Sequence, residues 1–254
     1  MRHGLLETPA IGFVSPPRWA SPSIVEFPAV VAGEILIQQC IPDLPSFVYT
    51  LANIDAAHPQ ICGAARLLGE AGCRAVAMEG TPFGWARMET EVAARSRVAE
   101  MTAAAGVPGV MAGTAIVDAL RALGATRVAL CPTYYPTDWR DSWRAFVAAC
   151  GFDVIYCQTM ADQGLVEAIE DTDDYGWRTG PELIRAAVAA TAGSVPADAI
   201  VVTGAGCRTS PIILELEQIA GRPVIGADTA LFWSLAGAAD LALKPGALGS
   251  LTTA

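Results

Sequence analysis

Two short stretches of the chain have the residue types of a ligand-binding turn. Residues 74–81 (Arg-Ala-Val-Ala-Met-Glu-Gly-Thr) and 198–205 (Asp-Ala-Ile-Val-Val-Thr-Gly-Ala) are each an apolar run that ends in a polar residue and a glycine. Ligands bind just past the carboxyl ends of parallel strands, because backbone N–H groups and the next helix N-terminus converge there. Free N–H groups in such turns suit a carboxylate. The two copies predict two similar lobes that face each other across one cleft.

Side chains beside these turns could transfer protons. Cys207 lies three positions after Gly204, in the predicted first turn of a helix, where the helix dipole would lower its pKa. Glu79 directly precedes Gly80, and Tyr134 follows a predicted strand, where its hydroxyl could donate to a carboxylate. The catalytic candidates are therefore Cys207, Tyr134 and Glu79. The predicted substrate-binding residues are Pro16, Gly80, Thr81, Tyr134, Thr203, Gly204, Ala205 and Gly206.

The same glycines allow a second interpretation. Gly204 and Gly206 follow a strand and open a helical segment, as in a dinucleotide fingerprint, and Asp228 lies near the place of a ribose-binding acid. The third glycine of that fingerprint is missing, and the motif lies near the chain end. Dinucleotide binding by an α/β protein remains an alternative.

The amino-acid composition limits the kinds of partner that the protein is expected to bind. A formal net charge of −10 argues against nucleic acid and anionic membrane, because both require a basic face. The seven cysteines are scattered without a C-x-x-C pair, and there are only two histidines, so we expect no metal. The N-terminus shows no secretory signal, and we expect a cytoplasmic protein with no organic cofactor and a small carboxylic acid as its partner. The sequence leaves a homo-oligomer open.

Strand-like runs alternate with helical patterns, which is typical of an α/β fold with parallel sheets covered by helices. Strands are predicted near 11–14, 35–39, 75–78, 109–112, 127–130, 153–157, 199–203 and 223–225. Helices are predicted near 46–71, 84–105, 114–123, 137–149, 181–192, 211–220 and 229–243. We expect a first lobe over 1–115, with the C-terminal helix 229–254 packing back on it, and a second lobe over 116–228. The active-site cleft would lie between these pseudo-symmetric lobes.

Motifs over about residues 10–240 resemble the aspartate/glutamate racemase superfamily. They are similar to the branch that contains maleate cis–trans isomerase, arylmalonate decarboxylase and the racemase-like protein of ectoine-utilisation clusters. The motifs are Gly12-Phe-Val-Ser-Pro-Pro, Met78-Glu-Gly-Thr81, Leu123-Gly-Ala-Thr-Arg-Val-Ala-Leu, Tyr134, Thr203-Gly-Ala-Gly-Cys-Arg-Thr209, Leu216-Glu217 and Gly221-Arg-Pro-Val.

The resemblance implies a carboxylate substrate between two lobes and chemistry without metal or organic cofactor. The family's isomerases and racemases use two cysteines, one per lobe, and its decarboxylase keeps only the second. By this matching both positions are glycine here, Gly80 and Gly204, while the carboxylate-binding Thr81 and Tyr134 are kept.

The replacement of both family cysteines by glycine leaves two possible functions. The first is a cofactor-independent lyase or isomerase acting next to the carboxylate of a small (di)carboxylic or amino acid. The second is a non-catalytic carboxylate-binding or accessory protein of a catabolic pathway such as ectoine utilisation.

Overall fold

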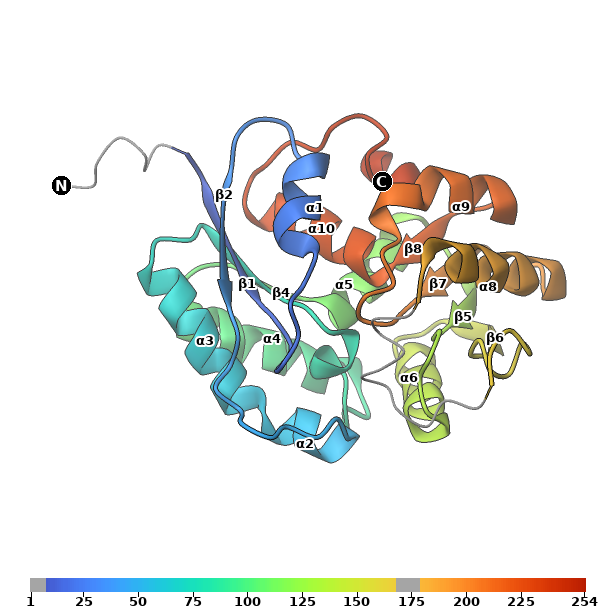
Figure 1. Cartoon of the computed structure of the whole chain (residues 1–254), viewed down its shortest axis with the longest axis horizontal. Coiled ribbons are helices and arrows are strands. Elements are labelled where there is room, and N and C mark those ends of the chain that lie inside the picture. The colour runs from blue at the N-terminus through green and yellow to red at the C-terminus, as the bar shows by residue number, and fades with distance from the viewer. Residues whose placement is uncertain (1–7, 168–178) are drawn as a thin grey trace.

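Two parallel sheets form the centre of the molecule (Figure 1). The computed structural model describes residues 8–167 and 179–254. The first sheet has the order β2-β1-β3-β4 and the second the order β6-β5-β7-β8, so both have the same crossover pattern. The strands are β1 (Ala10–Val14), β2 (Leu36–Cys40), β3 (Ala75–Met78), β4 (Gly109–Met111), β5 (Arg127–Cys131), β6 (Asp153–Cys157), β7 (Ala199–Val202) and β8 (Val224–Gly226). Residues in β3 and β7 are all buried, as expected for parallel strands covered on both faces.

Helices cover both sheets. In the first lobe α3 and α4 pack on each other and against β1 and β4, whereas α10 packs on α5, β3 and β4. In the second lobe α8 packs on α9 and β5, and α6 packs on β6. The helices are α1 (Ser23–Val30), α2 (Leu51–Ala56), α3 (His58–Glu70), α4 (Glu91–Ala105), α5 (Ala112–Ala122), α6 (Thr137–Ala149), α8 (Pro181–Ser194), α9 (Ile213–Ala220) and α10 (Ala227–Ala238). Short 3₁₀ helices are η2 (Thr81–Gly84), η3 (Ser210–Ile212) and η4 (Gly249–Thr253).

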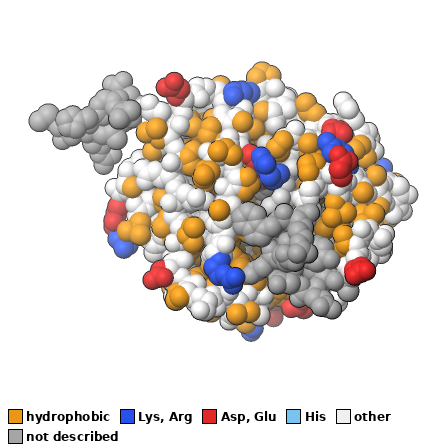
Figure 2. Space-filling view, viewed as in Figure 1, with side chains coloured by type: hydrophobic (Ala, Val, Ile, Leu, Met, Phe, Trp, Pro, Cys, Tyr) orange, Lys and Arg blue, Asp and Glu red, His pale blue; other side chains and the backbone are white. Residues whose placement is uncertain are grey.

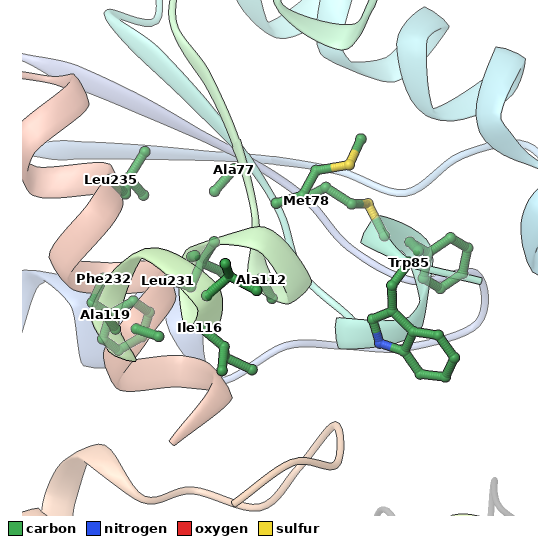
Figure 3. Close-up of a cluster of buried hydrophobic side chains, with 14 of the residues drawn as sticks. Ala77, Met78, Trp85, Ala112, Ile116, Ala119, Leu231, Phe232 and Leu235 are labelled. Carbon is green, nitrogen blue, oxygen red and sulfur yellow. The ribbon is translucent and has the colours of Figure 1, made fainter. Parts of the chain in front are cut away.

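Helix α10 joins the two sheets. It begins directly after β8 of the second sheet, yet its apolar face packs on α5 and on β3 of the first. Figure 3 shows Leu231, Phe232 and Leu235 of this helix beside Ile116 of α5 and Ala77 of β3. All five side chains are buried, and each large apolar side chain stabilises the fold by about 1.5–3 kcal/mol. The lobes are therefore held together by a continuous apolar core.

The predicted strands are confirmed, with every end within one residue of the observed strand. Three helix predictions were wrong in part, those for 46–71, 84–105 and the C-terminal helix from 229, which ends at Ala238 and is followed only by η4. The predicted helix 46–71 is divided at Ala57 into α2 and α3, because Pro59 has no N–H to continue the hydrogen-bond ladder. The predicted helix 84–105 begins only at Glu91, where the Thr90 hydroxyl accepts from the N–H of Ala93. Helix α1 was missed, because it contains Pro28.

Charged groups are spread over the surface. On the face drawn in Figure 2, Lys and Arg side chains occupy separate places among hydrophobic and uncharged groups. The described residues on this face do not gather into one continuous basic surface. Within residues 8–167 and 179–254, no helix is long and apolar enough to cross a bilayer.

Candidate active site

Each glycine turn follows a central strand, β3 in the first sheet and β7 in the second. Val14 of β1 pairs with Met78 of β3, and Cys131 of β5 pairs with Val202 of β7. The strands of each pair therefore end level, so the turn after β1 lies beside Gly80 and the turn after β5 lies beside Gly204. Both glycine turns line one cavity, which we call the polar cavity. This cavity lies at the carboxyl ends of the central strands, where ligands bind in open α/β sheets.

A second, aromatic cavity adjoins the first. The two share four lining residues, Pro16, Trp19, Gly80 and Ala205. The remaining lining of the aromatic cavity is Tyr49, Ile54, Pro82, Phe83, Tyr134, Tyr135 and Trp139. One compartment thus presents backbone and charged groups, and the other presents mostly apolar rings.

Close packing requires glycine at both turns. A β-carbon on Gly80 would lie 2.8 Å from Cγ of Pro16, and the φ angle of Gly80 is +75°. At Gly204 φ is +143°, and a β-carbon would lie 2.4 Å from Oγ1 of Thr133 and 3.0 Å from Sγ of Cys207. An L side chain at either position would meet both backbone strain and steric overlap. The volume beside Gly204 is thus already filled by other side chains.

Backbone N–H groups of both turns are left for a ligand. Those of Gly80, Thr81, Gly204, Ala205 and Gly206 have no hydrogen-bond acceptor within the described ranges. All five residues line the polar cavity. Unpaired backbone donors beside a cavity form a site for an anionic oxygen. This arrangement suits a carboxylate or the oxyanion of a reaction intermediate.

The electrostatic prediction for Cys207 was wrong. Its thiol lines the polar cavity and lies 3.2 Å from Oγ1 of Thr133. Burial raises the pKa of this thiol to about 12, whereas the sequence predicted a lowered pKa. The turn leads only into the three-residue η3, which provides a weak dipole, so desolvation decides the direction. Cys207 is therefore a neutral thiol, suited to donate a proton rather than to attack as a thiolate.

Glu79 lines the polar cavity from the end of β3. Its carboxylate accepts a hydrogen bond of 2.6 Å from the Ser15 hydroxyl and a second from Ser21. The Ser15 oxygen in turn accepts from the Gln39 amide at 2.6 Å. Burial raises the pKa of Glu79, although these serine hydroxyls act in the opposite direction. A buried carboxyl with a raised pKa is suited to general acid–base chemistry.

An ion pair between the lobes closes another side of the polar cavity. Arg208, after the Gly204 turn, donates to the buried carboxylate of Glu26 in α1. Burial raises the pKa of Glu26, and the nearby carboxylate of Asp228 raises it further. Sequence reasoning missed Glu26, because α1 itself was not predicted.

Asp228 has a structural role that the dinucleotide interpretation did not foresee. Its carboxylate accepts from the N–H groups of Thr209 and Ser210, both at 2.8 Å, and from the Thr209 hydroxyl. It also accepts from the N–H of Thr229 at 2.8 Å. With these four hydrogen bonds the carboxylate connects the loop after Gly204 to the start of α10. Its oxygens therefore have little remaining capacity to accept hydrogen bonds from a ribose.

The Tyr134 hydroxyl is also used in a hydrogen bond within the protein. Its hydroxyl donates to the carbonyl of Ala205 at 2.5 Å, so its proton is used to hold the turn. The sequence predicted a donor to the substrate carboxylate, and in this structure that proton is not available. Tyr134 is better described as a residue that positions Ala205 and lines the aromatic cavity.

The structure brings nearly all predicted site residues to the two cavities. Those that line the polar cavity are Pro16, Glu79, Gly80, Thr81, Gly204, Ala205, Gly206 and Cys207. Thr203 lines neither cavity, and its side chain is buried. Tyr135, which sequence reasoning passed over, lines the aromatic cavity; its only signal was its place next to Tyr134. Within the described part of the chain, no three His, Cys, Asp or Glu side chains are placed to hold a metal ion.

Two four-stranded parallel sheets and a cavity between their glycine turns define the aspartate/glutamate racemase-like class of fold. The solved structures that match include arylmalonate decarboxylase, with a TM-score of 0.78 at 24% identity over 96% of this chain and 99% of that chain. They also include the maleate isomerase of Pseudomonas putida, with a TM-score of 0.81 at 20% identity over 96% of this chain and 98% of the other.

Sequence comparison identifies the family. A family model described as arylmalonate decarboxylase matches residues 50–252. The arylmalonate decarboxylase of Bordetella bronchiseptica is 30% identical over 235 residues, which cover 89% of this chain and 88% of that protein. The chain belongs to the arylmalonate decarboxylase family.

Proposed function

We propose that this protein is a cofactor-independent decarboxylase or isomerase that acts beside the carboxylate of a small carboxylic acid. The observation that carries the proposal is the position of the neutral Cys207 thiol next to the unpaired N–H groups of Gly204, Ala205 and Gly206. A proton donor and an oxyanion site then face the same cavity. Membership of the arylmalonate decarboxylase family supports this class of chemistry.

In a decarboxylation, the bond between the α-carbon and one carboxylate breaks, and CO₂ leaves. The electron pair stays on the α-carbon and is delocalised into the remaining carboxylate as an enediolate. Unpaired N–H groups of the two turns and the Thr81 hydroxyl would stabilise the charge on its oxygens. The Cys207 thiol gives its proton to the α-carbon, and the thiolate regains a proton from water. The high thiol pKa suits this step, because the acceptor is a strongly basic carbanion.

Isomerisation or racemisation would use a second group to remove a proton. Glu79 lines the same cavity at the other turn, and burial raises its pKa toward the range of a general base. Among residues 8–167 and 179–254 no Lys or Arg forms an ion pair with Glu79, whereas Glu26 is held by Arg208. Glu79 and Cys207 are therefore the proposed acid–base groups, with one from each lobe.

The test is product analysis by NMR in D₂O with phenylmalonate, maleate and a set of amino acids. Conversion should place deuterium at the α-carbon of the product, because the transferred proton comes from an exchangeable thiol. The Cys207→Ala variant should lose at least about 100-fold in rate and still bind substrate, since a general acid contributes 10²–10⁴-fold. Full activity in this variant would contradict the role of Cys207.

The glycines at 80 and 204 favour a second candidate, a carboxylate-binding or accessory protein without turnover. The supporting observation is that Thr133, Tyr134 and Cys207 fill the volume where a side chain at 204 would lie. In that case carboxylates should raise the unfolding temperature and be recovered unchanged. Consumption of any stabilising ligand would exclude this candidate. A role in ectoine utilisation stays a prediction that the neighbouring genes can test.

A further inference from the structure

Three serine hydroxyls surround the buried carboxyl of Glu79. Ser15, Ser21 and Ser23 are 0%, 8% and 6% exposed, and Glu79 itself is 6% exposed. Burial disfavours an ionised carboxylate unless hydrogen bonds replace the water that it loses. In the described part of the chain, the groups that oppose this effect of burial on the pKa of Glu79 are these serine hydroxyls, with no basic side chain among them. The charge state of Glu79 therefore depends on neutral hydrogen-bond donors.

Strand register places Ser15 beside Glu79. Val14 of β1 pairs with Met78 of β3, and one residue further on these strands lead into Ser15 and Glu79. The pairing continues for this residue, since the N–H of Glu79 donates to the Val14 carbonyl at 3.1 Å. Residues in register on neighbouring parallel strands point to the same face of the sheet. The Ser15 hydroxyl therefore meets Oε2 of Glu79, at 2.6 Å, from a position that the sheet fixes.

The direction of the Ser15 hydroxyl is fixed as well. Its oxygen accepts a hydrogen bond of 2.6 Å from the side-chain amide of Gln39 in β2. The amide nitrogen can only donate, so the single hydrogen of the Ser15 hydroxyl is left for Glu79. A donor that points at a carboxyl oxygen stabilises the ionised form. Ser15 thus acts as a fixed donor to the carboxylate.

Ser21 is a donor that can change its acceptor. Its hydroxyl donates to Oε1 of Glu79, and its oxygen accepts from the N–H of Ser23 at 3.2 Å. The hydroxyl oxygen of Ser23 lies 3.1 Å away and is an alternative acceptor. When Glu79 takes up a proton, the Ser21 hydroxyl can turn to Ser23 and accept from the carboxyl. Glu79 can therefore gain or lose a proton without movement of a heavy atom.

We infer that Ser15 and Ser21 are positioning residues that hold Glu79 as the proton acceptor of the polar cavity. Ser15 fixes one carboxylate oxygen, and Ser21 fixes the other until the proton arrives. In this step the α-proton of the substrate passes to Glu79, and the electron pair of the C–H bond stays on the α-carbon as an enediolate. The inference rests on the proposed function, because it explains how the base of that function is kept ready to accept a proton.

Other charged groups face Glu79 across the polar cavity. They are Glu26 of α1, Asp228 of α10, and Arg208 and Cys207 of the loop after β7. The Glu26 and Glu79 carboxyls are close enough that the charge of Glu79 raises the pKa of Glu26. All of these groups are kept when a serine is replaced. A change in the titration of Glu79 in a serine variant therefore reports the missing hydroxyl.

The ionisation of Glu79 can be measured without a substrate. In protein that carries ¹³C in its glutamate carboxyl groups, the NMR signal of Glu79 is the one that is absent from Glu79→Gln. Ser15→Ala and Ser21→Ala should each move its titration midpoint to higher pH by about one pH unit, because a hydrogen bond to a charged group is lost. Ser194→Ala is the matched control, since the Ser194 hydroxyl donates to the Ala190 carbonyl at an exposed place.

Two further variants separate the hydroxyl from packing. Ser21→Thr keeps the hydroxyl and has room for a methyl group, because Ser21 lines the polar cavity, so it should titrate like the wild type. Gln39→Ala, at an exposed position, removes the group that orients the Ser15 hydroxyl. It should raise the midpoint in the wild type and have no effect in the Ser15→Ala background. If Ser15→Ala does not fold, Gln39→Ala alone still tests this contact.

Several results would overturn the inference. A midpoint that stays at the wild-type value in both serine-to-alanine variants, or moves to lower pH, would show that the hydroxyls do not favour the ionised carboxylate. An equal shift in Ser21→Thr and Ser21→Ala would show that packing controls Glu79. With an acid that the protein isomerises or racemises, a pH profile of kcat that does not follow the NMR midpoint would also contradict it. The proposed function fails separately, when the midpoints move as expected and none of the acids is converted.

Discussion

The Cys207 sulfur lies 3.0 Å from the point that a β-carbon on Gly204 would occupy. A thiol group therefore lies beside Gly204, close to where a side chain at that position would begin. It comes from three residues further along the chain and is held against the Thr133 hydroxyl. The glycine and the nearby thiol form one packed unit, and a change in either should affect the other.

Replacement of Gly204 by alanine should destabilise the protein. The new β-carbon would overlap Oγ1 of Thr133 at 2.4 Å, and φ at this position is unfavourable for an L residue. Overpacking of this kind costs about 1–3 kcal/mol, which urea unfolding can measure. Gly63→Ala in α3 is the control, because nothing lies within 4 Å of its β-carbon and alanine favours a helix. Equal stability of Gly204→Ala and wild type would contradict the packing argument.

Cys207 should resist alkylation in the folded protein. With a pKa of about 12, roughly one thiol in 10⁴ is ionised at pH 8, so iodoacetamide should react about 1,000-fold more slowly than with an exposed cysteine. The peptide that contains Cys207 can be followed by mass spectrometry, and the same thiol in urea is the control. Rapid alkylation of Cys207 in the folded protein would contradict a raised pKa and would support the lowered pKa that the sequence predicted.

Strand positions could be predicted because each strand is an unbroken apolar run between turn residues. β3 (Ala75–Met78) and β6 (Asp153–Cys157) were predicted with their observed ends, as was α6 (Thr137–Ala149). The helix prediction failed where the hydrophobic periodicity and the effect of a proline conflict. Residues 46–71 have helical periodicity, and the pattern did not reveal that Pro59 interrupts the ladder.

The place of the candidate site could be predicted, but its chemistry could not. Glycines after strands mark the turns, and ligands bind at the carboxyl ends of parallel strands. Burial of the Cys207 thiol depends on side chains about 70 residues away, such as Thr133, and no local pattern reports it. The buried Tyr135 ring is a similar case, since its surroundings include Trp85 of the first lobe.

Loss of the Arg208 side chain should destabilise the contact between the lobes. In Arg208→Met the buried Glu26 carboxylate loses its partner, and we expect a loss of about 1–2 kcal/mol at pH 7, less than for a fully buried pair because Arg208 is half exposed. The pKa of Glu26 is already raised by burial, so its protonation on acidification should remove most of this loss. Urea unfolding at pH 7 and pH 4.5 measures both effects. The double variant Glu26→Gln/Arg208→Met should recover stability at pH 7, and failure to recover would show that the ion pair is not the cause.

Stability should depend on pH through Glu79. Burial raises the pKa of this carboxyl, so the folded state favours its protonated form. The resulting stability is complete below the ordinary pKa of about 4.5 and is lost as pH rises through the raised pKa of the folded state. Glu79→Gln cannot ionise and escapes this loss, so its unfolding temperature relative to wild type should increase with pH. A difference of about 1 kcal/mol corresponds to about 2–4 °C in a protein of this size, which thermal unfolding between pH 4 and pH 8 can resolve. Glu34→Gln, at an exposed position, is the control and should follow the wild type. If the Glu79→Gln difference is flat across this range, Glu79 is ionised throughout without penalty, and its proposed part in proton transfer loses its physical basis.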